Sequence, residues 1–257
     1  MTISTGLRAL VTAGASGIGW SIASALHAAG ARVHICDASL SAIANVQQAT
    51  PEITASLADV TVVEEVDNLF AEVRATLGGL DVLVNNAGIA GPTAAVEHIT
   101  PDDWRRTLDV NITGQFLCVR RAVPLLKQSG EGLIINMSSA AGRLGYAMRT
   151  PYAASKWAIV GFTQSLAIEL GPSGIRVNAI LPGVVEGPRM EQVIRDRANA
   201  EGLTYEEMEK RYLSQISLRR MVSASDVAEM VLFLCSNGGR NISGQSLGVC
   251  GNLEYLR

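Results

Sequence analysis

The sequence predicts an α/β fold, a doubly wound parallel sheet with helices on both faces. Two observations indicate this class. Short apolar runs alternate with amphipathic helical segments along the chain, as expected for parallel strands joined by helical crossovers. Clusters of glycine, serine, asparagine and aspartate also follow the ends of these apolar runs, and sheets of this kind bind ligands at the carboxyl ends of their strands.

Size and composition limit the possibilities further. The 257 residues suit one large domain, and no linker, repeat or change of composition divides them, so we expect a single domain over residues 1–257. The net charge of −3 comes without a basic cluster, so neither nucleic acid nor membrane is an expected partner. The four scattered cysteines and three histidines lack ligand spacing, so no metal is expected. Without a secretion-signal pattern or a membrane-spanning apolar run, we expect a cytoplasmic protein.

The first elements follow one another in strand–helix order. The apolar run Leu7–Thr12 is a predicted strand that leads into a glycine-rich turn, and a helix with apolar residues at helical spacing comes next. The strand Arg32–Asp37 ends on an acidic residue. Further helices are predicted near 39–49 and 62–77, and further strands near 53–57 and 81–85.

The second half continues this order with longer helices. We expect two, at Pro101–Lys127 and Pro151–Leu170, and two buried strands, at 133–137 and 175–181. The polar stretch 187–212 is interpreted as a mobile flap over the substrate, with a plain surface excursion as the alternative. An amphipathic helix over 224–234 and an edge strand at 246–249 complete the chain.

The glycine turn predicts a nucleotide site. Its glycines let the backbone approach a pyrophosphate, and the helix that follows directs free N–H groups and a positive dipole end at the same place. Asp37 lies 18 positions after Gly19, where a Rossmann-type unit holds a ribose with a carboxylate. A tight turn alone would explain the glycines, but the strand, the helix and the acid together favour a dinucleotide. The residues expected to bind it here are Gly14, Ser16, Gly17, Ile18, Gly19 and Asp37.

A second pattern predicts acid–base chemistry. Thr150-Pro151 is a helix start with Thr150 as its cap, so Tyr152 and Lys156 fall one turn apart. A free tyrosine titrates near ~10, and a neighbouring ammonium favours its phenolate. Ser139, with Ser138 as second choice, can hydrogen-bond a substrate oxygen while Tyr152 exchanges a proton. The Tyr/Lys spacing alone also fits an incidental surface pair.

Taken in order, the glycine turn, Asn85-Asn86-Ala87-Gly88, Asn111, Ser139, Tyr152-x-x-x-Lys156 and Pro182-Gly183 resemble the motifs of the short-chain dehydrogenase/reductase family. The resemblance covers nearly the whole chain. It implies a single Rossmann-type domain with about seven parallel strands and hydride transfer between a nicotinamide cofactor and an alcohol or carbonyl carbon.

The same resemblance assigns roles to individual residues. It makes Tyr152 the acid/base, Lys156 the modulator of the tyrosine pKa and a ligand of the nicotinamide ribose, and Ser139 the group that polarises the substrate oxygen. Asn111 matches the asparagine that holds a water in the family's proton relay. The remaining cofactor residues that it implies are Asp59, Val60, Asn86, Ala87, Gly88, Pro182, Gly183 and Val185.

Two positions depart from the family pattern. Ala13 stands where the first glycine of the phosphate turn is usual, and Gly187 stands where a threonine often bonds the carboxamide. The substitution at Ala13 is mild because Gly14, Gly17 and Gly19 remain. Without the threonine hydroxyl, backbone groups or the flap must hold the carboxamide.

Cofactor, substrate and assembly follow as expectations. Asp37 would repel a 2′-phosphate, and neither Ser16 nor Ala38 offers it a cation, so we expect NAD. Arg149 and Arg189 flank the site and favour a small polar substrate such as a sugar, sugar acid or hydroxy acid, unless they face solvent or bridge subunits. Alternatives are a 3-oxoacyl-thioester reductase, a dehydratase or epimerase, and a non-catalytic NAD-binding regulatory protein. The two long helices and the apolar C-terminal segment favour a homotetramer.

Overall fold

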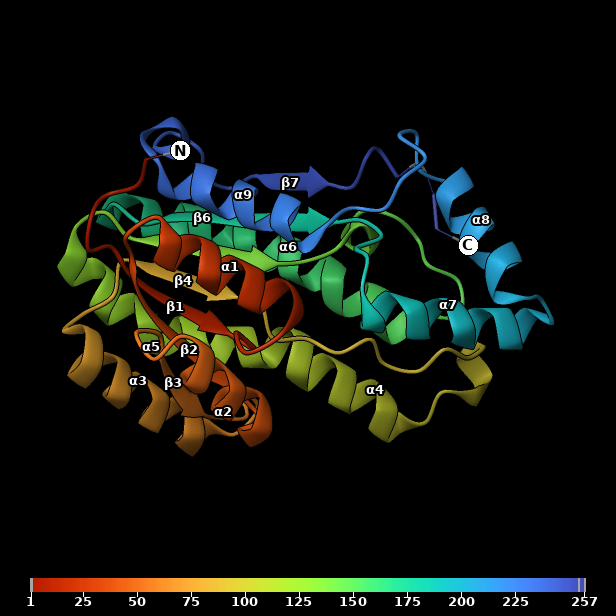
Figure 1. Ribbon diagram of the computed structural model, residues 1–257, viewed down its shortest axis with the longest axis horizontal. Coiled ribbons are helices and arrows are strands. Elements are labelled where there is room, and N and C mark those ends of the chain that lie inside the picture. The colour runs from red at the N-terminus through yellow and green to blue at the C-terminus, as the bar shows by residue number, and fades with distance from the viewer. Residues whose placement is uncertain (1, 254, 257) are drawn as a thin grey trace.

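The strands form one parallel sheet in the computed structural model, which describes residues 2–253 and 255–256 (Figure 1). The strand order is β3-β2-β1-β4-β5-β6-β7, and each neighbouring pair is parallel. The order changes direction between β1 and β4, which is the point where open α/β sheets bind ligands. The predicted doubly wound α/β fold is therefore confirmed.

The elements alternate as the periodicity of the sequence predicts. The strands are β1 (Arg8–Thr12), β2 (Arg32–Asp37), β3 (Thr54–Leu57), β4 (Val82–Asn85), β5 (Leu133–Met137), β6 (Arg176–Pro182) and β7 (Ser246–Val249). The α-helices are α1 (Gly17–Ala28), α2 (Leu40–Ala49), α3 (Val63–Leu77), α4 (Pro101–Leu108), α5 (Gly114–Ser129), α6 (Thr150–Leu170), α7 (Pro188–Glu201), α8 (Tyr205–Ser214) and α9 (Ala224–Cys235).

The sheet is buried on both faces by two hydrophobic clusters. Alternate residues of β1 show the division, since Ala9 and Val11 belong to the cluster that includes α1 and α9. Leu10 between them belongs to the cluster that includes α3, α5 and α6. Side chains of a strand alternate between faces, so a strand covered on both sides must be continuously apolar. This explains why the strands appear in the sequence as unbroken hydrophobic runs.

The stretch predicted to be a flap forms two packed helices, α7 and α8. They lie at the end of the sheet toward which the strand arrows point (Figure 1). Gly202 ends α7 with a φ of 67°, and Thr204 begins α8 with a reciprocal capping box to Glu207. Buried residues of both helices, among them Ile194 and Tyr212, form a third hydrophobic cluster with the C-terminal segment. The helices therefore cover the carboxyl ends of the strands.

Residues 101–129 are helical without a gap, as predicted for Pro101–Lys127, but a π-helical turn interrupts the regular α-helix. Helix α4 stops at Leu108, a π-helical turn occupies Asp109–Thr113, and α5 begins at Gly114. The cause is Asn111, whose side chain accepts a hydrogen bond from the Ile89 N–H at 2.7 Å and donates to the Ile89 carbonyl at 3.1 Å. A side chain held from outside the helix stabilises the wider turn, and π turns of this kind occur mostly at functional sites.

The prediction that Thr150 caps α6 is wrong. Arg149 holds the N-cap position without a side-chain cap, and Thr150 is already helical. The Ala153 N–H bonds the Arg149 carbonyl at 2.9 Å, so the helix starts one residue earlier. Pro151 still lies in the first turn, where its missing N–H is not needed.

Two features are absent from the part of the chain that the structure describes. None of its helices combines the length and apolar character that crossing a membrane requires. No group of three or more histidine, cysteine or acidic side chains gathers at metal-binding distance among those residues. The four cysteines are free thiols.

Candidate active site

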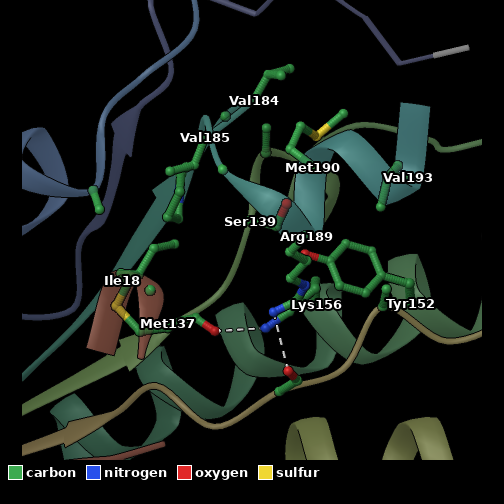
Figure 2. A pocket seen from close by; sticks show the side chains of 18 of the residues that line it. Ile18, Met137, Ser139, Tyr152, Lys156, Val184, Val185, Arg189, Met190 and Val193 are labelled. Atoms are coloured by element: carbon green, nitrogen blue, oxygen red, sulfur yellow. Dashed lines mark hydrogen bonds between the residues drawn. The ribbon is translucent and has the colours of Figure 1, made fainter. Parts of the chain in front are cut away.

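A cavity of about 540 Å³ opens at the carboxyl ends of β1, β4, β5 and β6. Its wall combines the glycine turn after β1, the start of α6, the segment after β6 and the start of α7 (Figure 2). Several segments that the sequence analysis singled out therefore meet at one place. The predicted site residues that line the cavity are Ser16, Gly17, Ile18, Asn86, Gly88, Ser139, Arg149, Tyr152, Lys156, Pro182, Gly183, Val185 and Arg189.

The glycine turn is tied to the end of β4. The Thr12 hydroxyl accepts hydrogen bonds from the N–H groups of Asn86 at 2.9 Å and Ala87 at 3.0 Å. Gly19 packs so closely that a Cβ there would lie 2.1 Å from the Ala13 carbonyl oxygen. Gly14 is held beside β2, where its N–H donates to the Cys36 carbonyl at 3.0 Å. Gly14, Gly19 and Ala87 thus lie behind the residues of the cavity wall and support them.

The turn fits a dinucleotide. Helix α1 begins without a side-chain cap at Ser16, so its first N–H groups remain free to donate to a phosphate. Gly17 has a φ of 53°, a left-handed conformation that glycine adopts without strain. Ala13, at the departure from the family pattern, is also left-handed with a φ of 48°. A side chain in this region costs about 1 kcal/mol, so the departure is accommodated with strain.

The acidic residues expected at the ribose and adenine lie outside the cavity wall. Asp37 ends β2 beside the glycine turn, and its carboxylate accepts from the N–H groups of Ala15 at 3.2 Å and Ser39 at 3.0 Å. The Asp59 carboxylate accepts from the Thr61 hydroxyl at 2.8 Å. Val60 is buried against Gly114. Asp37 ends β2 as predicted, while its ribose contact and the adenine contacts of Asp59 and Val60 stay predictions.

Tyr152 and Lys156 lie together on the first turns of α6. The Lys156 ammonium nitrogen is 5.6 Å from the centre of the Tyr152 ring and donates to the Met137 carbonyl at 2.9 Å (Figure 2). Burial raises the pKa of the Tyr152 phenol, but the charges of Lys156, Arg189 and Arg149 and a hydrogen bond with Ser139 together leave that pKa lowered. Burial lowers the pKa of Lys156 to about 8, and the Arg189 charge acts in the same direction.

The structure distinguishes the two candidate serines. The Ser138 hydroxyl is buried and donates to the Lys156 carbonyl at 2.8 Å, so it fastens α6 to the end of β5. The Ser139 hydroxyl accepts from the Ala141 N–H at 3.2 Å and shares a hydrogen bond with Tyr152 that lowers the tyrosine pKa. Ser139 is therefore the serine in position to contact a substrate oxygen.

Asn111 is fully buried behind the cavity. Besides its two bonds to Ile89, its amide donates to the Ser155 hydroxyl at 2.9 Å, and Ser155 donates to the Tyr152 carbonyl at 2.7 Å. Gly88 lies between Asn111 and Lys156, since a Cβ there would meet their polar atoms at 3.1 and 3.5 Å. This contact places Asn111 next to the catalytic helix, while its role as a water holder stays a prediction.

Two arginine side chains lie on the cavity wall near Tyr152. The Arg149 guanidinium lies 5.3 Å from the centre of the Tyr152 ring and 5.4 Å from that of Tyr146. Arg189 reaches from α7 to donate to the Gly88 carbonyl at 3.2 Å (Figure 2). Arg143 instead directs its guanidinium at the Cys250 sulfur, 3.2 Å away, and is not part of the cavity wall.

Some cavity residues were missed by the sequence analysis. The Tyr146 and Tyr212 hydroxyls hydrogen-bond each other at 2.6 Å, and burial raises the pKa of Tyr212. No local pattern marks these tyrosines, because they are 66 residues apart and meet only through tertiary packing. Met190, Val193, Leu253 and Leu256 add an apolar rim from α7 and the C-terminal segment.

Known proteins share this chain's sequence and architecture over nearly its full length. Residues 12–252 match a family model described as enoyl-(acyl carrier protein) reductase. The chain is 34% identical to D-beta-hydroxybutyrate dehydrogenase of Cupriavidus necator over 245 residues, which cover 93% of this chain and 94% of the relative. It is 28% identical to the solved structure of NAD+-bound xylitol dehydrogenase, with a TM-score of 0.93 and coverage of 96% and 99%.

A third similar protein is a single-residue variant of actinorhodin polyketide ketoreductase, solved with NADPH. It is 34% identical, the TM-score is 0.92, and the match covers 98% of this chain and 99% of the other. These relatives are dehydrogenases and reductases that share the sheet described above. With Ser139, Tyr152 and Lys156 gathered beside a dinucleotide turn, the chain is an oxidoreductase of the short-chain dehydrogenase/reductase family.

Proposed function

We propose that the protein is an NAD-dependent oxidoreductase that interconverts a secondary alcohol, or a sugar hemiacetal carbon, and its carbonyl. One observation carries this proposal. The Tyr152 phenol lies at the cavity wall between Ser139 and Lys156, and its pKa is lowered although it is partly buried. A phenol with a lowered pKa gives up its proton more readily, which is what general acid–base catalysis by a tyrosine requires.

In this reaction each residue of the site has a separate role. A bound nicotinamide accepts the hydride in oxidation and supplies it in reduction. In oxidation the Tyr152 phenolate takes the proton of the substrate hydroxyl, and in reduction the Tyr152 phenol returns a proton to the carbonyl oxygen. Ser139 donates a hydrogen bond to that oxygen. The Lys156 ammonium stabilises the phenolate and can hold the nicotinamide ribose, and Asn111 is proposed to hold a water that relays the proton outward.

The preference for NAD rests on Asp37. Its carboxylate ends β2 beside the glycine turn, where it can accept both ribose hydroxyls and would repel a 2′-phosphate. The solved relatives contain NAD+ in one case and NADPH in another, so they are compatible with either cofactor. We expect NADH to bind at least about tenfold more tightly than NADPH, and Asp37→Ser to remove most of this difference. Fluorescence titration measures both constants, and tighter binding of NADPH would refute the assignment.

The substrate is proposed to be small and polar, a sugar, sugar acid or hydroxy acid. Two arginines and the Tyr146–Tyr212 hydroxyl pair support this, since they line the cavity on the side of Tyr152. The relatives named for β-hydroxybutyrate and xylitol agree with this size and polarity. Similarity to a polyketide ketoreductase favours the second candidate, a 3-oxoacyl-thioester reductase. We further propose that α7 and α8 act as the substrate flap and that the protein is cytoplasmic.

A panel of polyols, sugars, hydroxy acids and 3-oxoacyl thioesters, assayed with NAD or NADH, tests the proposal. We expect turnover on at least one small alcohol and a loss of about 10²-fold or more in Tyr152→Phe. Tyr205→Phe on α8 is the matched control, because Tyr205 is not part of the cavity wall. Undiminished turnover in Tyr152→Phe would contradict the catalytic assignment. Product formation without net cofactor reduction would instead indicate dehydration or epimerisation.

A further inference from the structure

Two arginines of the cavity wall have no carboxylate partner in residues 2–253 and 255–256. Arg149 and Arg189 take part in none of the ion pairs found there. Arg197 nearby shows the usual arrangement, since it is buried and pairs with Glu201 at 2.8 Å. Charged groups in an interior are normally paired, so the buried and unpaired Arg149 requires an explanation.

Arg149 is the more costly exception because only 2% of it is exposed. Its Nη2 donates to the Ala90 carbonyl at 2.7 Å and its Nη1 to the Thr93 hydroxyl at 3.4 Å. These neutral acceptors fix the direction of the guanidinium without cancelling its charge. Its Nε has no hydrogen-bond acceptor among the described residues. The buried positive charge thus lies oriented against the rings of Tyr146 and Tyr152.

Arg189 is the accessible member of the pair. It is exposed in the first turn of α7, and within the described part of the chain its guanidinium donates only to the Gly88 carbonyl. Figure 2 shows its side chain beside Lys156 and close to Tyr152. A single 3.2 Å bond to a neutral carbonyl holds an arginine weakly, so the side chain can turn toward an anion.

The balance of charge at the cavity favours an anion. Arg149, Lys156 and Arg189 bring three positive charges to its wall. Glu186 is the only acidic residue of that wall among the described residues, and it is exposed and joins no ion pair there. An enclosed site with an excess of one charge attracts ligands of the opposite charge.

We propose that the substrate carries a carboxylate and that Arg149 and Arg189 bind it. This inference rests on the proposed function, because it names the substrate class of the same site. Arginine suits the task, since its planar guanidinium can hold both oxygens of a carboxylate. The Arg149 guanidinium carbon is only 5.3 Å from the centre of the Tyr152 ring. The carboxylate and the reacting carbinol are therefore separated by few bonds, as in a short-chain hydroxy acid.

Binding of unreactive probes tests the carboxylate site without turnover. The NADH complex is titrated with butyrate and with butyramide, which differ only in charge and donor pattern. We expect butyrate to bind about tenfold or more tightly than butyramide. Arg149→Met and Arg189→Met should each reduce this preference to about twofold. Arg195→Met is the matched control on α7, because Arg195 is exposed and outside the cavity wall, and it should keep the preference.

Three outcomes of the titration would overturn the proposal. The first is equal affinity of the wild-type complex for acid and amide. The second is a preference for the acid that survives in both arginine variants. The third is a weakened affinity of Arg189→Met for NADH with an unchanged preference for butyrate, which would make the cofactor pyrophosphate the anion that Arg189 binds.

A kinetic comparison separates carboxylate binding from a structural role of Arg149. With 3-hydroxybutyrate and 3-hydroxybutyramide as substrates, Arg149→Met should raise KM about tenfold for the acid and leave KM for the amide within about twofold. Arg149→Lys keeps the charge and should recover part of the loss. An equal fall of kcat on both substrates would show that Arg149 only positions Tyr152. If neither compound nor any other alcohol turns over, the proposed function fails, whereas the titration still reports on the carboxylate site.

Discussion

Several positive charges surround one phenol in this protein. Lys156, Arg189 and Arg149 each lower the pKa of Tyr152, and together with the Ser139 hydrogen bond they overcome the effect of its burial. The family resemblance accounts for Lys156 and Ser139, whereas it assigns no role to the two arginines. The ease with which Tyr152 loses its proton therefore depends on residues that also line the cavity.

The pH dependence of alcohol oxidation should reveal these charges. In the proposed mechanism Tyr152 is the base, so kcat/KM should rise with pH as the phenol ionises, with a midpoint below its usual pKa of 10.0. Removing a cation disfavours the phenolate, so Arg189→Met should move the midpoint upward by about one pH unit. A pH–rate profile with a neutral alcohol measures this shift free of carboxylate binding. Arg195→Met should leave the midpoint in place, and an unmoved midpoint in Arg189→Met would contradict the prediction.

Ala13 offers a test of strain in the phosphate turn. Its φ of 48° is unfavourable for alanine by about 1 kcal/mol, whereas glycine adopts it freely. Ala13→Gly should leave the free energy of unfolding unchanged or raise it by up to about 1 kcal/mol, because relief of strain is partly offset by the greater entropy of the unfolded chain. Ala44→Gly, at an exposed position inside α2, should lower it by about 1 kcal/mol. Urea unfolding compares them, and equal destabilisation would show that Ala13 is unstrained.

Strands β2 and β3 and helix α3 share a buried polar cluster far from the reaction. The His34 ring on β2 hydrogen-bonds the hydroxyls of Thr54 and Ser56 on β3, each at 2.7 Å. Ser56 donates its proton to Glu72 on α3, so it must accept from His34 Nε2, and the ring is the neutral Nε2–H form. Burial lowers the pKa of His34 to about 4, although the charge of Glu72 opposes this.

This histidine should make stability depend on pH. The unfolded chain binds the imidazole proton below pH 6.5, but the folded protein does not bind it until about pH 4. The free energy of unfolding should therefore fall as pH drops through this window, by about 2 kcal/mol between pH 7 and pH 5. Urea unfolding at both values measures the loss. His34→Gln can bond the same hydroxyls but does not titrate. Between pH 7 and pH 5 its free energy of unfolding should therefore fall by about 2 kcal/mol less than that of the wild type. An identical fall in both proteins would disprove the role of His34.

At the level of the whole molecule, the outer surface of α5 and α6 exposes large apolar side chains to solvent. Phe116 is 48% exposed, Trp157 51% and Ile168 81%. Large apolar side chains concentrated on such helices favour burial against another copy of the chain. We propose the homotetramer that the family resemblance implies, with these helices at the subunit contacts. Helix α6 would then be supported by a neighbouring subunit on its outer side, while its inner side carries Tyr152 and Lys156.

Sedimentation tests the assembly. At micromolar concentration the wild type should sediment as four chains of 27.1 kDa each. Trp157→Glu and Ile168→Glu should each produce smaller species, because a buried carboxylate in an apolar contact is strongly unfavourable. Leu40→Glu is the control, since Leu40 is 66% exposed on α2, away from these helices. A wild-type monomer at this concentration would eliminate the proposal.

The sequence by itself determined the fold class and most of the catalytic group. Strands and helices were predictable because burial on both sheet faces demands unbroken apolar runs, and the helices show their own period. Polar residues at strand ends were predictable because parallel strands end on the same side of the sheet. This rule brought the glycine turn, Gly88, Ser139 and Pro182 to one cavity, as the structure shows.

Tertiary structure alone decided what depends on contacts between distant residues. The choice of Ser139 over Ser138 follows from the bond that Ser138 makes to α6. The π-helical turn between α4 and α5 follows from the hydrogen bonds between Asn111 and Ile89. The meeting of Tyr146 with Tyr212 is of the same kind. The unpaired charge of Arg149 was likewise decided by tertiary structure. A local sequence pattern does not show which acceptors the folded chain brings to a side chain, or whether a carboxylate is among them.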